Sequence, residues 1–249
     1  MLHDLEKKHD IRILMAVNSG SRSFGYASAK SDWDVRFIYV HRPEWYFSIV
    51  KTEDTIEIML EEEHLDIEGY DLKKALILLV KTNPVVSDWL HSNDYFIIDE
   101  NFKNTMLSFE SQCYNPHHAM YHFYSTSVKQ NLQYLNENKT LKRFIYYMRG
   151  LLSCRWVEQN CSHPPVDIDE LIDATITDSD AIKKKAHDIL DLKRTGKSQD
   201  IAIPDMKLVT YMSKMQEYYK ELLPVYLDTK QKVDIPVISR FLMNTVLEN

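Results

Sequence analysis

The sequence is poor in the residues that define several specialised classes of protein. It has three cysteines, an odd and sparse set that makes no disulfide framework. Five glycines and eight prolines in 249 residues leave no room for low-complexity tracts. The longest apolar run, 75–80, is far too short to span a membrane, and residues 1–10 carry charges where a signal peptide would be apolar. We therefore expect a soluble, cytoplasmic protein.

What remains is the composition of an ordinary globular protein. Hydrophobic residues make up 44% of the chain and charged residues 27%, which is enough for a real core in one large domain or two small ones. Cys154, Cys161 and His163 could be drawn as a zinc site. No fourth ligand stands at a recognisable spacing, so we do not expect zinc there.

Charge is distributed unevenly along the chain. The net charge of −7 argues against indiscriminate binding to nucleic acid, which needs a broad basic surface. Residues 53–68 contain many acids and no lysine or arginine, whereas residues 111–157 are basic and contain a single acid, Glu137. An acidic part that meets a basic part would suit a site for cations and polyphosphate, although two unrelated solvated faces would give the same pattern.

The hydrophobic pattern predicts an α+β protein. Four short apolar segments are typical of strands: 11–17, 32–40, 55–60 and 64–68. Helices are predicted at 72–81, with Asp71 as the N-cap, and at 85–91. From about His117 onward, apolar residues recur at helical spacing. We therefore predict a sheet domain over residues 1–110, followed by a helical domain over residues 111–249.

Two aspartates stand two residues apart at the start of the second predicted strand. Because alternate side chains of a strand share a face, Asp32, Asp34 and Arg36 are expected to point the same way. The two carboxylates repel each other unless a cation lies between them, and Mg²⁺ prefers such oxygen ligands. The pattern predicts a site for two Mg²⁺ ions, with Mn²⁺ as a substitute, that would activate an attacking hydroxyl and steady a leaving pyrophosphate. The alternative is a polar strand end without a ligand.

A turn of small residues precedes these aspartates. Gly20 lets the backbone come close to a ligand, and Ser21 with the amides that follow it can hold phosphate oxygens. Arg22 adds positive charge. Since the turn lies shortly before Asp32 in the sequence, both are expected at one edge of the sheet.

The ordered set of Gly20-Ser21, Gly25 and Ser31-Asp32-Trp33-Asp34, leading into an apolar strand, resembles the signature of the DNA polymerase β superfamily of nucleotidyltransferases. The wider pattern resembles a bacterial and phage family within it, named for a supposed role in RNA repair. The likeness continues in 66–76, 81–84, His117-His118 and 143–156, and it fades after Pro165. The resemblance implies a polymerase β-type sheet domain followed by a helical domain, an NTP donor such as ATP, and an RNA 3′ end, for example of a damaged tRNA, as acceptor.

The superfamily uses a third carboxylate on a neighbouring strand. Asp66 is the candidate by position, Glu68 on the same face is the second choice, and Glu57 is the third. Together with Asp32 and Asp34, Asp66 is therefore expected to bind metal and to take part in catalysis. The candidates for contacts to the nucleotide are Gly20, Ser21, Arg22, Arg36, His118, Lys142 and Arg143.

Several histidine and basic residues could serve the ligand or the fold. His118 could contact a base or ribose, or it could serve in helix capping and packing. Lys142 and Arg143, with Arg149, could hold a triphosphate or an RNA end from the helical side, although Arg143 and Arg149 are six residues apart and cannot both face a cleft fully. Lys73 and Lys74, in the first turn of a helix where cations are unfavourable, could meet a phosphate or be surface residues.

The sequence therefore predicts a metal-dependent enzyme that moves a nucleoside monophosphate from an NTP to a hydroxyl. Adenylylation of a protein or a small molecule is an alternative within the same class. A catalytically silent binding or regulatory module is an alternative outside it, although such a module has no need of two repelling acids. No sequence feature specifies the oligomeric state.

Overall fold

The computed structural model describes residues 1–50, 52–136, 140–196, 204–227 and 233–248. The basic residue Lys139 lies outside these ranges. The chain forms two compact units. The sheet unit comprises residues 1–23, 32–114 and 231–249, and the helical unit comprises residues 24–31 and 115–230.

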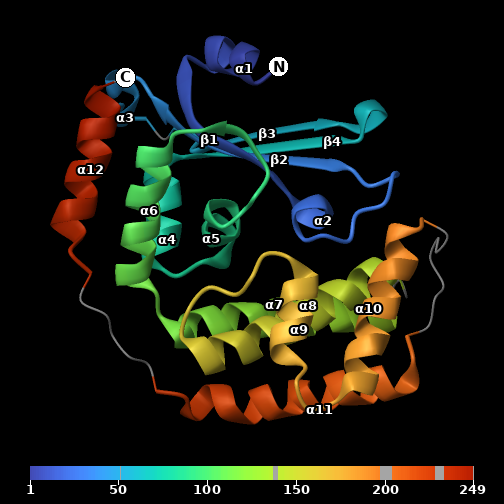
Figure 1. The fold of residues 1–249 in the computed structure, drawn as a ribbon. Coiled ribbons are helices and arrows are strands. Elements are labelled where there is room, and N and C mark those ends of the chain that lie inside the picture. The colour runs from blue at the N-terminus through green and yellow to red at the C-terminus, as the bar shows by residue number, and fades with distance from the viewer. Residues whose placement is uncertain (51, 137–139, 197–203, 228–232, 249) are drawn as a thin grey trace. The chain divides into compact units, whose positions relative to one another are not determined.

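The sheet unit is built on a five-stranded sheet with the order β3-β4-β2-β1-β5 (Figure 1). Its strands are β1 (Ile11–Ser19), β2 (Trp33–His41), β3 (Thr55–Leu60), β4 (Leu65–Asp71) and β5 (Tyr95–Ile98). Strands β2 and β4 are parallel, and the other neighbours are antiparallel. The four predicted strands are present. Strand β5 was not predicted, because four residues are too few to show a period.

Both faces of the sheet are covered by apolar side chains. On β2, Ile38 and Val40 face a core that includes side chains of α4 (Leu72–Val80), α5 (Pro84–Leu90), α6 (Glu100–Cys113) and α12 (Ile235–Leu247). Phe37 and Tyr39 face the opposite way, into a smaller core with Leu5 of α1 (Leu2–His9). Each such fully buried side chain contributes roughly 1.5–3 kcal/mol. The alternation along β2 therefore sends Asp34 and Arg36 to the face that the four helices cover.

The short elements of the sheet unit lie in its connections. Helix α2 (Gly20–Ser23) follows β1, α3 (Pro43–Tyr46) follows β2, and the 3₁₀ helix η1 (Glu61–Glu63) joins β3 to β4. The predicted helix after β4 is α4, and Asp71 is its N-cap, as expected. Helix α6 was not predicted, because its apolar positions alternate with many polar ones.

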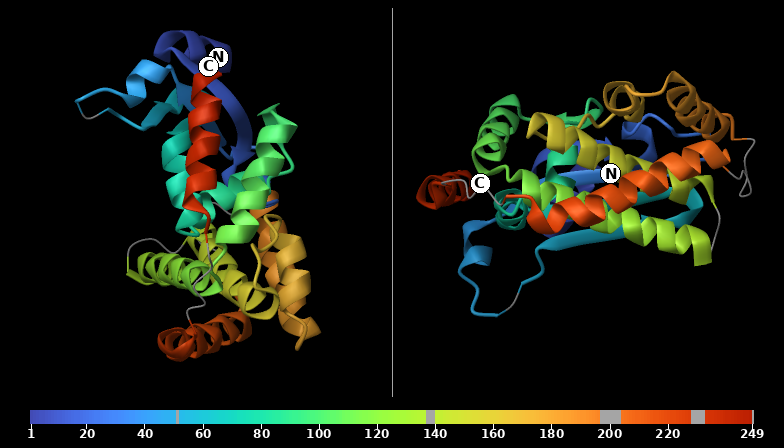
Figure 2. Two further views of the ribbon diagram at one scale, coloured as in Figure 1. Left: turned by 90° about the vertical axis from the view of Figure 1, so that its left-hand side faces the viewer. Right: turned by 90° about the horizontal axis from the view of Figure 1, so that it is seen from below.

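The helical unit contains α7 (Pro116–Asn136), α8 (Leu141–Asn160), α9 (Ile168–Thr175), α10 (Asp180–Arg194), α11 (Met206–Leu222) and the 3₁₀ helix η2 (Leu223–Val225). Helices α7 and α8 pack closely, because Gly150 leaves room for Ser127. The Ser127 hydroxyl donates to the Tyr147 carbonyl at 2.7 Å. Figure 2 shows these two helices side by side. The predicted α+β class, with sheet and helical parts, is thus confirmed.

The predicted cut at residue 110 stays a prediction about domains, but two segments, 24–31 and 231–249, belong to the compact unit on the other side of such a cut. Residues 24–31 belong with the helices, where Tyr26 is fully buried and Arg149 lies 3.9 Å above the Phe24 ring. Helix α12 belongs with the sheet unit, where it packs against α4 and β2. Its apolar residues need a partner surface, and the core that holds Ile38 provides one.

Within the described ranges, no helix combines the length and the apolar character that crossing a membrane would require.

Candidate active site

The structure brings Asp34 and Asp66 together. Strands β2 and β4 pair in parallel with Asp34 opposite Asp66 and Arg36 opposite Glu68, so all four side chains share one face of the sheet. Their carboxylates are partly open to solvent, with 25% of the Asp34 side chain and 30% of the Asp66 side chain exposed. The residue chosen as the third carboxylate is therefore the direct neighbour of the second aspartate.

Arg36 lies in the middle of this acid cluster, which we define as Asp34, Asp66 and Glu68. Its Nη2 is 2.7 Å from Asp66 Oδ2 and 3.3 Å from Asp34 Oδ1, and its Nε is 3.5 Å from Glu68 Oε2. Its Nη1 also donates to the Asp66 carbonyl at 3.0 Å. The guanidinium therefore offsets the repulsion among three carboxylates that would otherwise destabilise this edge.

The Gly20-Ser21 turn meets the same cluster. Ser19, the last residue of β1, pairs with Asp34, and Gly20 follows in the left-handed region with φ 61°. A Cβ atom on Gly20 would overlap Asp34 Oδ2, so any other residue would displace the carboxylate or the backbone. Ser21 is buried directly after it. The predicted meeting of the turn with the second aspartate is present in the structure.

Asp32 departs from the expected arrangement. Strand β2 begins at Trp33, so Asp32 precedes the strand and the expected common strand face holds only for Asp34 and Arg36. The Asp32 side chain is 56% exposed, and its Oδ1 lies 3.2 Å from Nδ1 of His64. The His64 carbonyl accepts a hydrogen bond from Trp33 N at 2.7 Å, which fixes this contact. His64 stands at the end of a run of acids, and no sequence signal marked it as a neighbour of Asp32.

Arg22 has local partners near the same edge. Its Nε donates to the Asp32 carbonyl at 3.2 Å, and its guanidinium carbon lies 4.0 Å from the centre of the Trp33 ring. This cation–π contact is on the order of 1 kcal/mol. The side chain therefore helps to shape the segment that carries Asp32, besides being available as a source of positive charge.

The carboxylates fit a divalent metal by their chemistry. Asp34 and Asp66 present hard oxygen atoms side by side, the type of ligand that Mg²⁺ and Mn²⁺ take, and Asp32 is exposed near the start of the same strand. In the part of the chain that the structure describes, no group of three or more His, Cys, Asp and Glu side chains is already arranged around a metal position. The side chain of Arg36, which lies between Asp34 and Asp66, occupies part of that space.

The candidates of the helical unit have positions of differing kinds. His118 is exposed in the first turn of α7, and its N–H donates to Asn115 Oδ1 at 3.1 Å. Lys142 is exposed in the first turn of α8. Arg143 donates to Gln133 Oε1 and so ties α8 to α7. The first two side chains are open to solvent, whereas Arg143 has a structural role.

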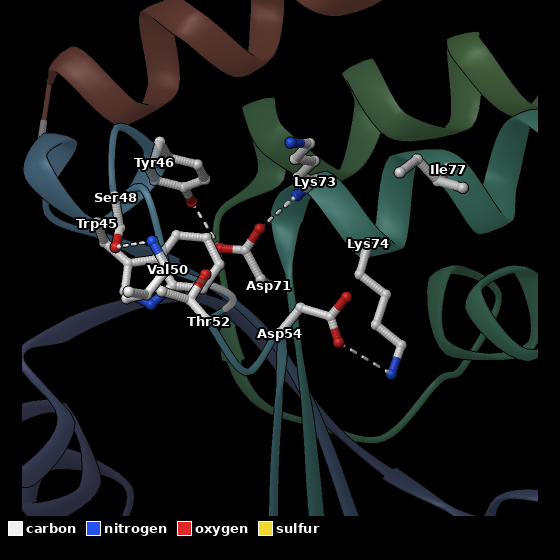
Figure 3. A pocket seen from close by; sticks show the side chains of 10 residues that line it. All are labelled: Trp45, Tyr46, Ser48, Val50, Thr52, Asp54, Asp71, Lys73, Lys74 and Ile77. Carbon is white, nitrogen blue, oxygen red and sulfur yellow. Dashed lines mark hydrogen bonds and ion pairs between the residues drawn. The ribbon is translucent and has the colours of Figure 1, made fainter.

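A pocket of about 290 Å³ lies at the other end of β4 and is shown in Figure 3. Asp71, on its wall, is fully buried and accepts hydrogen bonds from Tyr46 Oη at 2.6 Å and from Lys73 N at 2.8 Å. Burial, aided by the charge of Asp54, raises the pKa of Asp71 to about 6 against the opposing effect of these hydrogen bonds. Its role is that of an N-cap, as predicted.

The lysines of this pocket do not make it a phosphate site. Lys74 pairs with Asp54 at 3.6 Å and lies 4.1 Å from the centre of the Tyr70 ring, so its charge is already engaged. Lys73 shares the pocket with both Asp54 and Asp71. Two lysines and two acids give no preference for an anion, and the structural alternative holds for Lys74.

The structure thus brings together Gly20, Ser21, Asp34 and Asp66, the residues that carry the resemblance to nucleotidyltransferases of the polymerase β type. A family described as "RNA repair pathway DNA polymerase beta family" matches residues 1–244, and the chain belongs to this family. It is 31% identical over 252 residues to an uncharacterised protein, YcgL, of Bacillus subtilis (strain 168), a match that covers 99% of this chain and 94% of the relative.

A solved structure of a nucleotidyltransferase-like protein from Exiguobacterium sibiricum 255-15 is similar over 98% of this chain and 90% of its own. The TM-score is 0.30 and the identity is 10%, a likeness too distant to support any statement about this chain.

Proposed function

We propose that this chain transfers a nucleoside monophosphate from an NTP, with ATP as the favoured donor, to the hydroxyl of an RNA 3′ end and releases pyrophosphate. The observation that carries the proposal is the pairing of Asp34 with Asp66 directly against Gly20. The family, described by an RNA repair pathway, supports RNA as the acceptor. A cytoplasmic location stays a prediction from the sequence.

The acid cluster would hold the metal ions. Asp34 and Asp66, together with the exposed Asp32 that precedes β2, would bind two Mg²⁺ ions, which when bound supply charge stabilisation at the reacting phosphate and at the attacking and leaving oxygens. Asp66 would also accept the proton of the acceptor hydroxyl. A carboxylate that is 30% exposed can meet both a metal and a substrate group.

The neighbouring residues would bind and orient the donor. At Gly20 the backbone can approach the β- and γ-phosphates, since no side chain stands between it and Asp34, and Ser21 would bind a phosphate oxygen. Arg36 would keep the carboxylates close before the metal arrives, and could turn to the phosphates when metal replaces it in the cluster. Arg22 would add charge near Asp32.

The helical unit would supply contacts to the acceptor. His118 and Lys142 are exposed at the starts of α7 and α8, where a base or a phosphate could reach them. Arg143, tied to Gln133, would act indirectly by holding these two helices together. The rival acceptors are a protein side chain and a small molecule. Binding of RNA would weaken steeply with salt, because phosphate contacts release counterions, whereas tight NTP binding with a flat salt profile would favour the rivals.

The test is incubation with each α-³²P-labelled NTP, Mg²⁺ or Mn²⁺, and total cellular RNA or protein. We expect label in RNA with the wild type, and at least about 100-fold less with Asp34→Asn, which keeps the side-chain shape but removes the charge that a metal needs. Asp54→Asn, an exposed acid at the other end of the sheet unit, is the control and should keep full activity.

Each outcome has a clear meaning. Full activity in Asp34→Asn would end the catalytic assignment, and label in protein alone would replace RNA as the acceptor. If calorimetry with Mg²⁺ and ATP gave no heat, the silent binding module would be the better reading.

A further inference from the structure

A group of residues remote in sequence holds both ends of the turn that carries Gly20 and Ser21. We define this turn as Ser19–Ser23. The residues that hold it are Ser92 and Asp94, which lie between α5 and β5. Neither belongs to the acid cluster, and no sequence motif marks either of them.

Ser92 connects the two ends of the turn. It is 1% exposed, and its hydroxyl donates to the carbonyl of Asn18 at 3.2 Å, just before the turn. The Ser23 hydroxyl, in the last residue of the turn, lies 3.4 Å from Ser92 Oγ. Because the single proton of Ser92 is given to Asn18, Ser23 is the donor in this contact. One oxygen atom thus fixes the chain on both sides of Gly20.

Asp94 fixes the same end of β1 through Asn18. The Asn18 side chain is 2% exposed, and its Nδ2 donates to Asp94 Oδ2 at 2.7 Å. The Asn18 N–H also donates to the Asp94 carbonyl at 2.9 Å, and Asp94 N donates to Ser92 Oγ at 3.2 Å. Asp94 and Ser92 therefore form one hydrogen-bonded unit with the residue that precedes the turn.

The backbone of this turn cannot move far without disturbing Asp34. Gly20 lies so close to Asp34 Oδ2 that even one added carbon atom would overlap it. A site with such a contact loses function when its backbone moves by about 1 Å, for which costs of about 100-fold in rate are typical. Contacts that hold the backbone on both sides of Gly20 should therefore matter for the reaction more than for the stability of the fold.

We infer that Ser92 and Asp94 are positioning residues that set the distance between the Gly20-Ser21 backbone and the metal-binding carboxylates. The kinetic part of this inference rests on the proposed function. The structural part, that these two residues order the turn, does not.

The experiment compares Asp94→Ala with Asp94→Asn, together with Ser92→Ala. Asparagine keeps an oxygen that accepts from Asn18 Nδ2, whereas alanine has none. We expect Asp94→Ala and Ser92→Ala to lower kcat about 10- to 100-fold with little change in the KM for the NTP, and Asp94→Asn to stay within about twofold of the wild type. Amide hydrogen exchange at residues 19–23 should become at least about tenfold faster in the two alanine variants and remain unchanged in Asp94→Asn.

The matched control is Ser127→Ala. Ser127 is a fully buried serine of the helical unit whose hydroxyl also donates to a backbone carbonyl. Its loss should lower the unfolding midpoint as much as the loss of Ser92 does, but leave kcat and exchange at residues 19–23 unchanged.

Two results would overturn the inference: unchanged exchange at residues 19–23 in Asp94→Ala and Ser92→Ala, or equal rates for Asp94→Ala and Asp94→Asn. If the wild type transfers no nucleotide, the proposed function fails by itself, and the exchange data still decide whether these residues order the turn.

Discussion

Strand β4 carries an aspartate at each end, and the two are used in opposite ways. Asp66, near the start, is partly exposed and forms an ion pair with Arg36 at 2.7 Å. Asp71, at the end, is fully buried, and its partners are the neutral donors Tyr46 Oη and Lys73 N. The two residues stand about 16 Å apart along the strand.

The comparison separates a carboxylate available for binding from one that serves the fold. A charged partner and access to solvent allow Asp66 to exchange that partner for a metal. Burial raises the pKa of Asp71 and leaves no room for another ligand, because both of its oxygens already accept hydrogen bonds. Chemical type alone therefore does not identify a site; the partners and the exposure do.

The largest expected effect is the difference in activity between Asp66→Asn and Asp71→Asn. Asp66→Asn should lower the rate of nucleotide transfer at least about 100-fold, because the proposed function makes Asp66 both a metal ligand and a base. Asp71→Asn keeps an acceptor for Lys73 N and should leave the rate within about twofold. Single-turnover rates with saturating NTP make the measurement. Glu68→Gln decides the remaining choice: loss of activity there, with activity retained in Asp66→Asn, would make Glu68 the third carboxylate.

A smaller effect, on stability, is expected from replacing Arg36, the cation of the acid cluster. Arg36→Met leaves three carboxylates without their shared partner, and should lower the free energy of unfolding by about 2 kcal/mol in metal-free buffer. Mg²⁺ should restore part of this loss, since it can take over the role of the guanidinium. Urea unfolding with and without Mg²⁺ is the measurement. Arg42→Met, which removes an exposed pair with Asp10, should cost less than about 1 kcal/mol and show no response to Mg²⁺. An Arg36 variant that Mg²⁺ does not stabilise would argue against metal binding at this cluster.

The last effect is the pH dependence of stability that Asp71 causes at the buried end of the strand. Because the pKa of Asp71 is about 6 in the folded protein and its ordinary value is 3.8, the folded state binds its proton more tightly than the unfolded state. Its contribution to stability is therefore full below about pH 4 and falls as the pH rises to about 6, by up to about 3 kcal/mol. The difference between wild type and Asp71→Asn in denaturant unfolding from pH 4 to 7 measures this contribution. A difference that is constant with pH would show that the pKa of Asp71 is the same in the folded and unfolded states.

Much of this site could be predicted because its signals are local. Apolar alternation identified β2 and β4, and two acids in the expected places on those strands became neighbours once the strands paired in parallel. The prediction for Asp32 was only partly correct, because the chain enters β2 one residue later and Asp32 turns to His64. That contact depends on the turn after η1, which carries no signal of its own.

The roles of the basic residues in 111–157 could not be predicted from the sequence, because helical periodicity does not indicate which group a side chain contacts. Arg143 donates to Gln133, Arg149 lies over Phe24, and Arg155 donates to the Thr175 carbonyl at 3.0 Å. These arginines hold the helical unit together, whether or not they meet a ligand. The positions of Ser92 and Asp94 were likewise hidden, since only the pairing of β1 with β5 brings them to Asn18.

The place of α12 affects the order in which the protein is made and folded. Ile238 and Val246 of this helix belong to the same apolar core as Ile38 of β2. Residues 115–230, which form most of the helical unit, are synthesised before this helix. During synthesis, the core that holds Ile38 therefore stays incomplete until residues 235–247 have emerged from the ribosome. Until then, part of its apolar surface is exposed to water or to a chaperone. A ribosome that stalls shortly before that point would release a chain with the signature of the enzyme but without a closed core.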